Sequence, residues 1–282
     1  MQIIRSVKKM QRVAREIAGS GRTIGLVPTM GYLHEGHLSL VRRAKKETDI
    51  VITTIFVNPA QFAPHEDLDR YPRDEKGDLR KIASAGGDIV FVPTASEMYP
   101  EGFQTYVSVE EIADWLEGAV RPGHFRGVAT VVAKLFNVTR PDVAGFGMKD
   151  YQQGAVIKRM ARDLGYPLKL IIAPTVRERD GLAMSSRNAY LRDPRHRREA
   201  VCLYYALRTA REMVRAGAAE PSKVRREMEA VIRATCPTGQ VDYIAFTDLE
   251  SLVPVRRIGK GTVCSLAVRL HGVRLIDNMK LA

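Results

Sequence analysis

Short apolar runs alternate with amphipathic segments along the first part of the chain. The runs are rich in Val and Ile, and several are uninterrupted by polar residues, as is typical of strands buried on both faces of a sheet. They predict strands at residues 23–27, 50–57, 88–92, 143–146 and 168–173.

The segments between these runs carry apolar residues three or four apart, which is the spacing of one buried helix face. Such faces are formed by Leu38, Val41 and Ala44, by Leu79 and Ile82, by Val128, Val131, Val132 and Leu135, and by Val156, Ile157, Met160 and Leu164. Strands that alternate with helices indicate βαβ units and a parallel sheet with right-handed crossovers. We therefore predict an α/β fold, a Rossmann-like doubly wound parallel sheet of five strands, with its ligand crevice at the carboxyl ends of the strands where the strand order reverses.

The pattern changes after about residue 187. Asp193 and Pro194 are typical of a helix N-cap and first turn, and the helix is expected to run towards Ala216 and end at Gly217. A second helix is expected after Pro221, followed by β-rich segments at residues 241–247, 262–270 and 273–276. The sequence thus predicts a Rossmann-like domain over residues 1–186 and a smaller C-terminal α+β domain over residues 187–282, with a helix pair and a small antiparallel sheet.

Composition is compatible with two globular domains. The chain has 282 residues, of which 45% are hydrophobic and 27% charged, and domains usually run about 100–200 residues. No apolar stretch is long enough for a transmembrane helix or a signal peptide, so we expect a cytoplasmic protein without a membrane partner. Cys202, Cys236 and Cys264 are odd in number and far apart, which indicates neither a zinc knuckle nor a disulfide framework, and we expect reduced thiols in or near the core.

A net charge of +12 permits either a nucleic-acid footprint or a protein that handles small polyanions. The basic residues are spread along the chain, with one local cluster at Arg192, Arg195, Arg197 and Arg198. This distribution completes no DNA- or RNA-binding motif. We interpret the cluster as a solvated basic surface and expect no nucleic-acid partner.

The most informative segment is residues 28–37, Pro-Thr-Met-Gly-Tyr-Leu-His-Glu-Gly-His, which follows the first predicted strand and leads into a helix. Gly31 and Gly36 allow a tight turn and a close approach to a ligand. The N–H groups and the dipole at the helix start favour a phosphate, beside which His34 and His37 are placed three residues apart. Two alternatives are histidines that only cap the helix or lie in solvent, and a metal site, for which no third ligand is evident. The strand, glycines and helix together favour the phosphate site.

His34-x-Gly36-His37 resembles the H-x-G-H signature of the nucleotidylyltransferase superfamily, whose second signature is typically Lys-Met-Ser-Lys-Ser. Residues 184–187, Met-Ser-Ser-Arg, stand where that second signature is expected, although Ala183 precedes them where a lysine would lead. Five blocks in register, at residues 28–31, 56–62, 121–127, 146–153 and 184–188, further resemble the pantothenate synthetase family. That family joins pantoate to β-alanine through a pantoyl adenylate, consumes ATP, and releases AMP and pyrophosphate.

The resemblance implies a set of site residues. The ATP-binding residues would be Met30, Gly31, Tyr32, Leu33, His34, Glu35, Gly36, His37, Gly147, Met148, Lys149, Asp150, Val176, Met184, Ser185, Ser186 and Arg187. His37 is implied as the catalytic proton donor, although the sequence alone does not rank it above His34. Lys149 and Arg187 would neutralise charge in the transition state. Gln61 and Gln153 would bind pantoate, and Gln61 would also face β-alanine.

Several details stay open at this stage. Val176 either offers backbone groups to the adenine or simply anchors a loop. Mg²⁺ is expected with ATP, with Asp150 and Asp78 as candidate ligands, and for Asp78 an exposed aspartate on a helix surface is the favoured interpretation. The family resemblance implies a homodimer.

Two other function classes compete with the ligase. A nucleotidylyltransferase that adenylylates a small substrate without an amine acceptor would fit the H-x-G-H residues equally, but not the two glutamine-bearing blocks. A basic nucleic-acid-binding protein would fit the charge, but not the site residues. A P-loop kinase is excluded because no G-x-x-x-x-G-K-[ST] segment is present.

Overall fold

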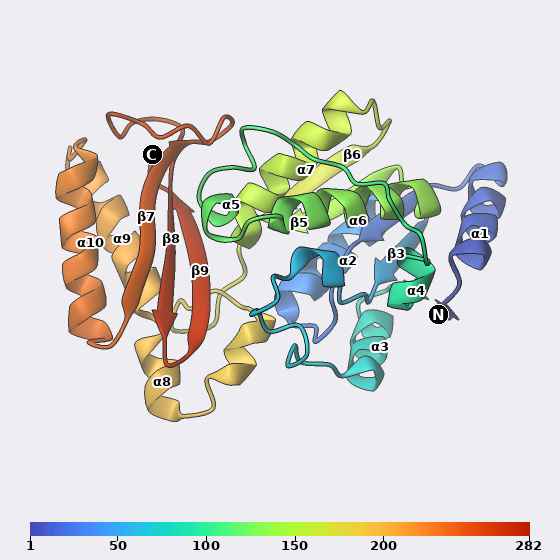
Figure 1. The fold of residues 1–282 in the computed structure, drawn as a ribbon, viewed down its shortest axis with the longest axis horizontal. Coiled ribbons are helices and arrows are strands. Elements are labelled where there is room, and N and C mark those ends of the chain that lie inside the picture. Colours follow the sequence, from blue (N-terminus) through green and yellow to red (C-terminus); the bar gives the residue numbers. More distant parts are fainter. The chain divides into compact units, whose positions relative to one another are not determined.

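The computed structural model describes residues 1–282 and contains a six-stranded and a three-stranded sheet (Figure 1). The chain separates into two units, which are described one at a time. Unit 1 comprises Met1–Gly147 and Gln153–Pro174, and unit 2 comprises Met148–Gln152 and Thr175–Ala282.

The sheet of unit 1 is wholly parallel, with the strand order β1-β4-β3-β2-β5-β6. Its strands are β1 (Gln2–Ile4), β2 (Ile24–Val27), β3 (Ile50–Thr54), β4 (Ile89–Phe91), β5 (Val143–Gly147) and β6 (Lys169–Ala173). After β2 the chain adds β3 and β4 on one side and later returns to add β5 and β6 on the other. The strand order therefore reverses between β2 and β5, which is where a doubly wound sheet opens its ligand crevice.

Helices cover both faces of this sheet. The first seven helices of the chain are α1 (Val7–Gly19), α2 (Glu35–Glu47), α3 (Glu75–Ser84), α4 (Ala95–Met98), α5 (Glu117–Val120), α6 (His124–Thr139) and α7 (Tyr151–Asp163). Leu26 and Ile52 pack in a core cluster with residues of α1, α6 and α7, whereas Val27 and Val51 pack with residues of α2. Because successive strand residues point to opposite faces, these two clusters lie on opposite faces of the sheet.

The predicted doubly wound parallel sheet is confirmed, and its five predicted strands are β2 to β6. The edge strand β1 was missed. It has three residues, only Ile4 is buried, and it pairs with β4 alone. So short a strand gives too few positions for a hydrophobic pattern to be recognised.

Unit 2 packs two long helices against an antiparallel sheet of order β7-β8-β9 (Figure 1). Its elements are α8 (Pro194–Glu199), α9 (Cys202–Arg215), α10 (Pro221–Thr235), β7 (Gln240–Asp248), β8 (Thr262–Leu270) and β9 (Val273–Lys280). Asp193 caps α8 by accepting a hydrogen bond from the Arg195 amide, as predicted. The helix pair and the small antiparallel sheet are likewise confirmed.

Two predicted boundaries in unit 2 were wrong. The single helix expected towards Ala216 is two helices, since α8 ends at Glu199 and α9 begins at Cys202. Between them the Val201 amide donates to the Arg198 carbonyl, three residues back, and not to the residue four back as in an α-helix. The last strand also continues to Lys280 because Asp277 and Asn278 are buried in spite of their polarity.

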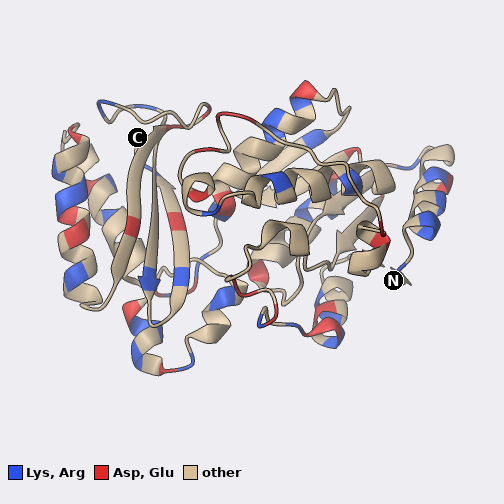
Figure 2. Cartoon of the chain, viewed as in Figure 1, with Lys and Arg blue, Asp and Glu red and all other residues tan.

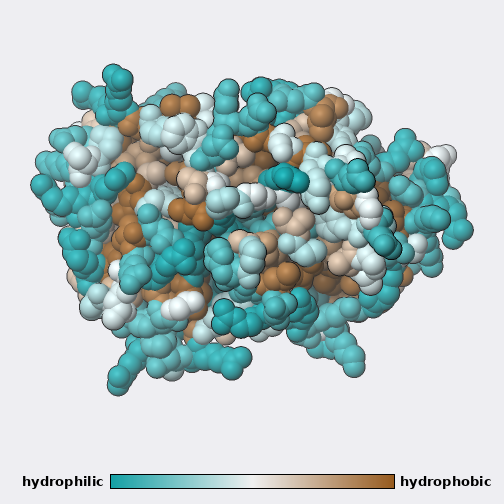
Figure 3. All heavy atoms as spheres, viewed as in Figure 1, coloured by the Kyte–Doolittle hydropathy of each residue, from teal (hydrophilic) through white to brown (hydrophobic).

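The surface is mixed in charge and hydropathy. Lys and Arg are interspersed with Asp and Glu on α3 and α10 (Figure 2), and hydrophilic residues cover most of the face shown in Figure 3. In the Arg192–Arg198 segment, Arg197 pairs with Glu178 at 2.7 Å and with Asp180 at 2.9 Å. No helix of the structure combines the length and apolar character that crossing a membrane requires.

Candidate active site

The loop that follows β2 in unit 1 is held tightly against the end of β3. The Thr29 amide donates to Thr54 Oγ1 at 3.1 Å, and the Thr29 hydroxyl donates to the Thr54 carbonyl. Gly31 has a φ of 87°, and a side chain at this position would come within 3.1 Å of Asp78 and of Ile55. Glycine is therefore required here both by its backbone angle and by the close packing of the loop.

Asp78 of α3 fixes the next part of this loop. Its two carboxylate oxygens accept the amides of Tyr32 and Leu33, each at 2.7 Å. Lys81 of the same helix donates to the Leu33 carbonyl at 2.8 Å. Burial raises the pKa of Asp78, although the two backbone donors and Lys81 oppose the rise.

The interpretation of Asp78 as an exposed helix-surface residue was therefore wrong, since only 1% of the residue is exposed. The helical spacing showed that the residue belongs to α3. It gave no sign that a loop from the neighbouring strand lies across that face of the helix.

His34 and His37 form a reciprocal cap at the start of α2. His34 Nδ1 accepts the Gly36 amide at 3.2 Å, and His37 Nδ1 accepts the His34 amide at 3.3 Å. The ring centroids lie 4.1 Å apart. Because each Nδ1 is an acceptor, the proton of each neutral ring is on Nε2. The two imidazoles thus present N–H donors beside the positive end of the α2 dipole, which favours an anion.

Gln61 lies in the loop that follows β3, within the short helix η1 (Pro59–Gln61). Its amide oxygen accepts from Asn58 Nδ2 at 3.0 Å, and its Nε2 lies 3.2 Å from Met30 Sδ. Asn58 is 1% exposed and also accepts from the Tyr99 hydroxyl at 2.7 Å. This network sets the orientation of the Gln61 amide and joins the loops that follow β2 and β3.

The segment Arg121–Gly127 supports the Gln61 loop from the other side. His124 Nδ1 donates to the Gln61 carbonyl at 2.8 Å, and His124 Nε2 accepts from Arg121 at 3.0 Å. A side chain at Gly127 would come within 2.1 Å of the Ala60 carbonyl oxygen. Burial, together with the charge of Arg121, lowers the pKa of His124 to about 4, so the imidazole is neutral at pH 7.

Arg121 is itself held by Glu66, with contacts of 2.6 and 2.8 Å. Burial of Glu66 favours its neutral form, but the hydrogen bond and charge of Arg121 outweigh burial and lower the pKa of Glu66. The ion pair therefore fixes the arginine that in turn fixes His124.

The remaining candidates of unit 1 are Gly147, the last residue of β5, and Gln153, in the first turn of α7. Since β2 and β5 are parallel neighbours, β5 ends with Gly147 at the same edge of the sheet where β2 ends and the loop of residues 28–37 begins. Both residues are partly exposed.

In unit 2, Met148, Lys149 and Asp150 form the short helix η2 (Met148–Asp150). Asn278 of β9 donates from its side-chain amide to the carbonyls of Met148 and Lys149, at 2.9 and 2.8 Å. Lys149 Nζ lies 3.4 Å from Asp150 Oδ1, and the Asp150 side chain is 48% exposed. The Asn278 amide thus fixes the backbone of η2.

The Met-Ser-Ser-Arg segment is also in unit 2. The Met184 amide donates to the Val176 carbonyl at 3.0 Å, and Ser185 Oγ accepts the Arg187 amide at 3.3 Å at the start of η3 (Ser186–Tyr190). The Val176 carbonyl is therefore engaged within the protein, as expected of a loop anchor.

Arg177 ties this segment to β9. It contacts Asp277 at 2.6 and 3.0 Å and the Gly181 carbonyl at 3.0 Å. Burial raises the pKa of Asp277, and the hydrogen bond and charge of Arg177 oppose the rise. Unit 2 thus holds both the η2 residues and the residue 184–187 segment against the same strand.

The chain resembles known proteins along its whole length. The family described as Pantoate-beta-alanine ligase matches residues 2–280. This chain belongs to that family. A relative named pantothenate synthetase, from Moorella thermoacetica, is 53% identical over 100% of this chain and 98% of its own length. A second, from Roseiflexus castenholzii, is 53% identical over 99% of this chain and 98% of its own length.

Solved structures of the pantoate–β-alanine ligase family have the same fold. The pantothenate synthetase of Thermus thermophilus superposes with a TM-score of 0.94 at 46% identity, covering 100% of this chain and 99% of that one. The enzyme of Francisella tularensis, complexed with beta-gamma ATP and beta-alanine, gives 0.83 at 34% identity and covers 99% and 97%. The predicted family and fold are thereby confirmed.

Sequence reasoning missed the residues that support the candidate site in this family member. Asn58, Arg121 and His124 fell within the matched blocks, but their roles were left open. Their contacts join segments about sixty residues apart, and no local spacing reveals such a pairing.

Proposed function

We propose that this chain condenses (R)-pantoate with β-alanine to give pantothenate, consuming ATP and releasing AMP and pyrophosphate. The observation that carries the proposal is the His34–His37 pair at the start of α2, whose Nδ1 atoms accept backbone amides and whose Nε2 atoms therefore donate. Membership of the ligase family supplies the substrates.

The reaction has two steps. A pantoate carboxylate oxygen attacks the α-phosphorus of ATP, the bond to the β-phosphate oxygen breaks, and pyrophosphate leaves. The β-alanine amine then attacks the acyl carbon of pantoyl adenylate, AMP leaves with the bonding electrons, and the amine loses a proton. Phosphoryl transfer of this kind depends mostly on positioning and on charge stabilisation.

The proposed roles follow from the chemistry of each side chain. His37 and His34 donate to phosphate oxygens, and Lys149 and Arg187 neutralise the charge that grows on them. Gln61 and Gln153 offer amide donors and acceptors to the pantoate hydroxyls and carboxylate. The Asn58 hydrogen bond that orients Gln61 supports this role, because a pre-set amide loses less freedom on binding.

Mg²⁺ is part of this proposal, since magnesium bound to ATP would neutralise phosphate charge and keep most of its water ligands. Of the two candidate carboxylates, Asp150 fits better because its side chain is half exposed. Both oxygens of Asp78 are instead engaged with backbone amides. A cytoplasmic location and a homodimer stay predictions alongside it.

The test is to incubate the protein with ATP, Mg²⁺, pantoate and β-alanine and to identify the products by mass spectrometry. We expect pantothenate, AMP and pyrophosphate in equal amounts, and no pantothenate when β-alanine is omitted. Formation of ADP and phosphate would show that the carboxylate is activated as an acyl phosphate and not by adenylation. Accumulation of an adenylylated product that β-alanine does not consume would favour the nucleotidylyltransferase.

A further inference from the structure

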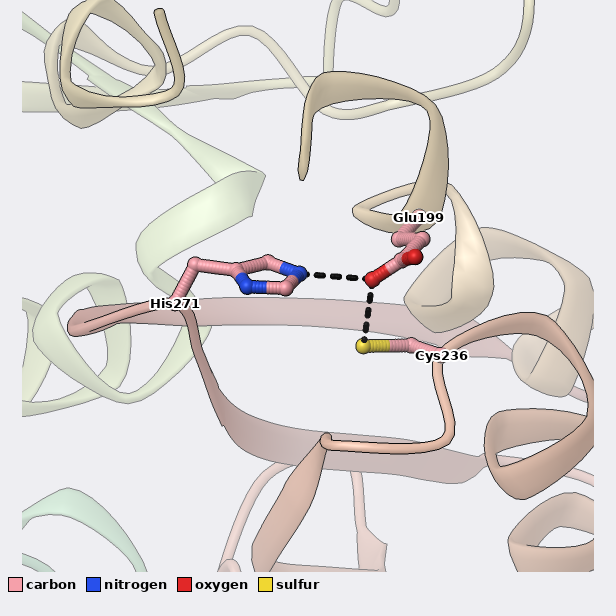
Figure 4. Close-up of side chains that lie close together, drawn as sticks. All are labelled: Glu199, Cys236 and His271. Carbon is pink, nitrogen blue, oxygen red and sulfur yellow. Dashed lines mark hydrogen bonds and ion pairs between the residues drawn. The ribbon is translucent and has the colours of Figure 1, made fainter. Parts of the chain in front are cut away.

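Three potential metal ligands meet in unit 2 outside every residue assigned above. Glu199 is the last residue of α8, Cys236 follows the end of α10, and His271 lies in the turn between β8 and β9. Their side chains converge from these three elements (Figure 4). They are distant in sequence, so no motif spacing connects them.

The donor atoms lie close together. Glu199 Oε2 is 2.6 Å from His271 Nε2 and 3.4 Å from Cys236 Sγ, and all three ligand atoms lie within 4.8 Å of one another. Tetrahedral zinc, with bonds of about 2.3 Å to sulfur and about 2.0–2.1 Å to nitrogen or oxygen, places its donors about 3.3–3.6 Å apart. The sulfur–oxygen distance already matches, and the nitrogen–oxygen distance needs to open by less than about 1 Å.

The chemistry of the set is selective. A thiolate, an imidazole and a carboxylate suit zinc, whereas magnesium and calcium prefer oxygen ligands alone. Cys236 is fully buried, and burial together with Glu199 raises the pKa of its thiol. The Glu199 and His271 side chains are 30% and 16% exposed, which gives an ion a path to the thiol from solvent.

His271 is unusual for its position. It has a φ of 49° and is followed by Gly272 with a φ of 77°, as the two central residues of a tight hairpin turn. Asn-Gly or Asp-Gly is the usual choice for such a turn. The His196 ring stacks on His271 with centroids 3.5 Å apart and planes 7° apart. Because a metal lies in the plane of the ring that binds it, the parallel His196 ring positions His271 and does not share its ligand.

We propose that Glu199, Cys236 and His271 form a zinc-binding site, with water as the fourth ligand. On binding, the Cys236 thiol releases its proton to solvent and the thiolate bonds to the ion. The proton that His271 Nε2 holds towards Glu199 leaves this nitrogen, by transfer to Nδ1 in a neutral ring or by release to solvent from a charged one, and Nε2 then bonds to the ion. The ion replaces the hydrogen bonds that Glu199 makes to His271 and Cys236. It thereby joins α8, the end of α10 and the β8–β9 turn of unit 2.

Cobalt substitution tests the site without reference to enzyme activity. The full-length protein, purified with a chelator and then dialysed, is titrated with Co²⁺ under reducing conditions. We expect a thiolate-to-cobalt charge-transfer band in the near ultraviolet and intense tetrahedral d–d bands in the visible, which Zn²⁺ abolishes at one equivalent. Zn²⁺ should also raise the melting temperature.

Matched cysteine variants make the assignment specific. Cys236→Ala should lose the charge-transfer band and bind zinc at least about 100-fold more weakly, a larger effect than that of losing an outer-shell partner. Cys264→Ala removes an equally buried thiol of the same unit, and this variant should keep the charge-transfer band and the wild-type affinity for zinc. His271→Asn, which tolerates the turn, should weaken zinc binding with the fold intact by circular dichroism.

The proposal is overturned if wild-type protein gives no charge-transfer band, or if Cys236→Ala retains it. In either case the three side chains form only a hydrogen-bonded clamp.

Discussion

At the scale of single residues, the two histidines of the H-x-G-H segment reconcile the interpretations that the sequence left in competition. Each ring caps the start of α2 through Nδ1, and that same hydrogen bond puts the proton on Nε2. Capping is therefore what prepares the imidazole to donate to a phosphate. Under the proposed function, a helix cap and a catalytic donor are one arrangement, which residue spacing alone could not have shown.

Replacing His37 separates these two contributions. His37→Ala should slow adenylate formation by about 10²–10³, the usual cost of losing one preorganised donor to a transition state. His37→Asn keeps a side-chain acceptor near the His34 amide but does not reach as far as Nε2, and it should be about as slow. Single-turnover release of pyrophosphate measures the rate of adenylate formation in both variants. Wild-type rates in His37→Asn would mean that the residue acts only as a cap.

His124 predicts a pH dependence of stability. Its pKa is about 4 in the folded protein against 6.5 for a free histidine, so between these values the unfolded chain binds more protons. The contribution of His124 to the free energy of unfolding is complete above about pH 6.5. It is lost as the pH falls towards 4, and the loss amounts to about 3 kcal/mol in all. Urea unfolding at intervals across this range measures the slope.

His124→Asn is the control for that measurement. The variant should be less stable at pH 7, because one hydrogen bond to the Gln61 carbonyl or from Arg121 is lost. Its stability should also fall less steeply than that of the wild type between pH 6.5 and 4. Parallel profiles would contradict the neutral, buried imidazole.

At the scale of elements, the conformation of the loop of residues 28–37, the proposed phosphate site, depends on a neighbouring helix. Asp78 of α3 accepts two consecutive loop amides, and Lys81 one turn further on donates to the same loop. The loop thus has its conformation set before any ligand arrives.

Asp78→Asn tests this dependence. The amide can accept only one of the two backbone N–H groups and turns its own NH₂ towards the other, so we expect a loss of about 1–3 kcal/mol in unfolding free energy. Adenylation should slow, while the Mg²⁺ concentration giving half-maximal rate stays at its wild-type value. A large change in that concentration alone, with unaltered stability, would instead make Asp78 a magnesium ligand.

The elements also show which parts of the fold the sequence determines locally. Strands such as β2 and β4 were predictable because they are continuous apolar runs buried on both faces. The edge strand β1 was not, because it has only three residues and depends on its pairing with β4. The same holds for the site. Its motif residues were identifiable, whereas supports such as Asn58 and His124 become evident only once the chain is folded.

At the scale of the whole molecule, the charge of +12 has no single local origin. Basic and acidic side chains are mixed on the helices of both units (Figure 2), and Arg197 of the basic cluster is occupied by two carboxylates. Such mixing is typical of a solvated surface.

The central claim is that the carboxylate is activated by adenylation before the amine reacts. Its most direct test is exchange of labelled pyrophosphate into ATP, measured with Mg²⁺ and pantoate and with β-alanine left out. If pantoyl adenylate forms reversibly, label should enter ATP only when pantoate is present, and His37→Ala should lower the exchange rate by about 10²–10³. Pantothenate synthesis without any pantoate-dependent exchange, accompanied by ADP and phosphate, would contradict the account.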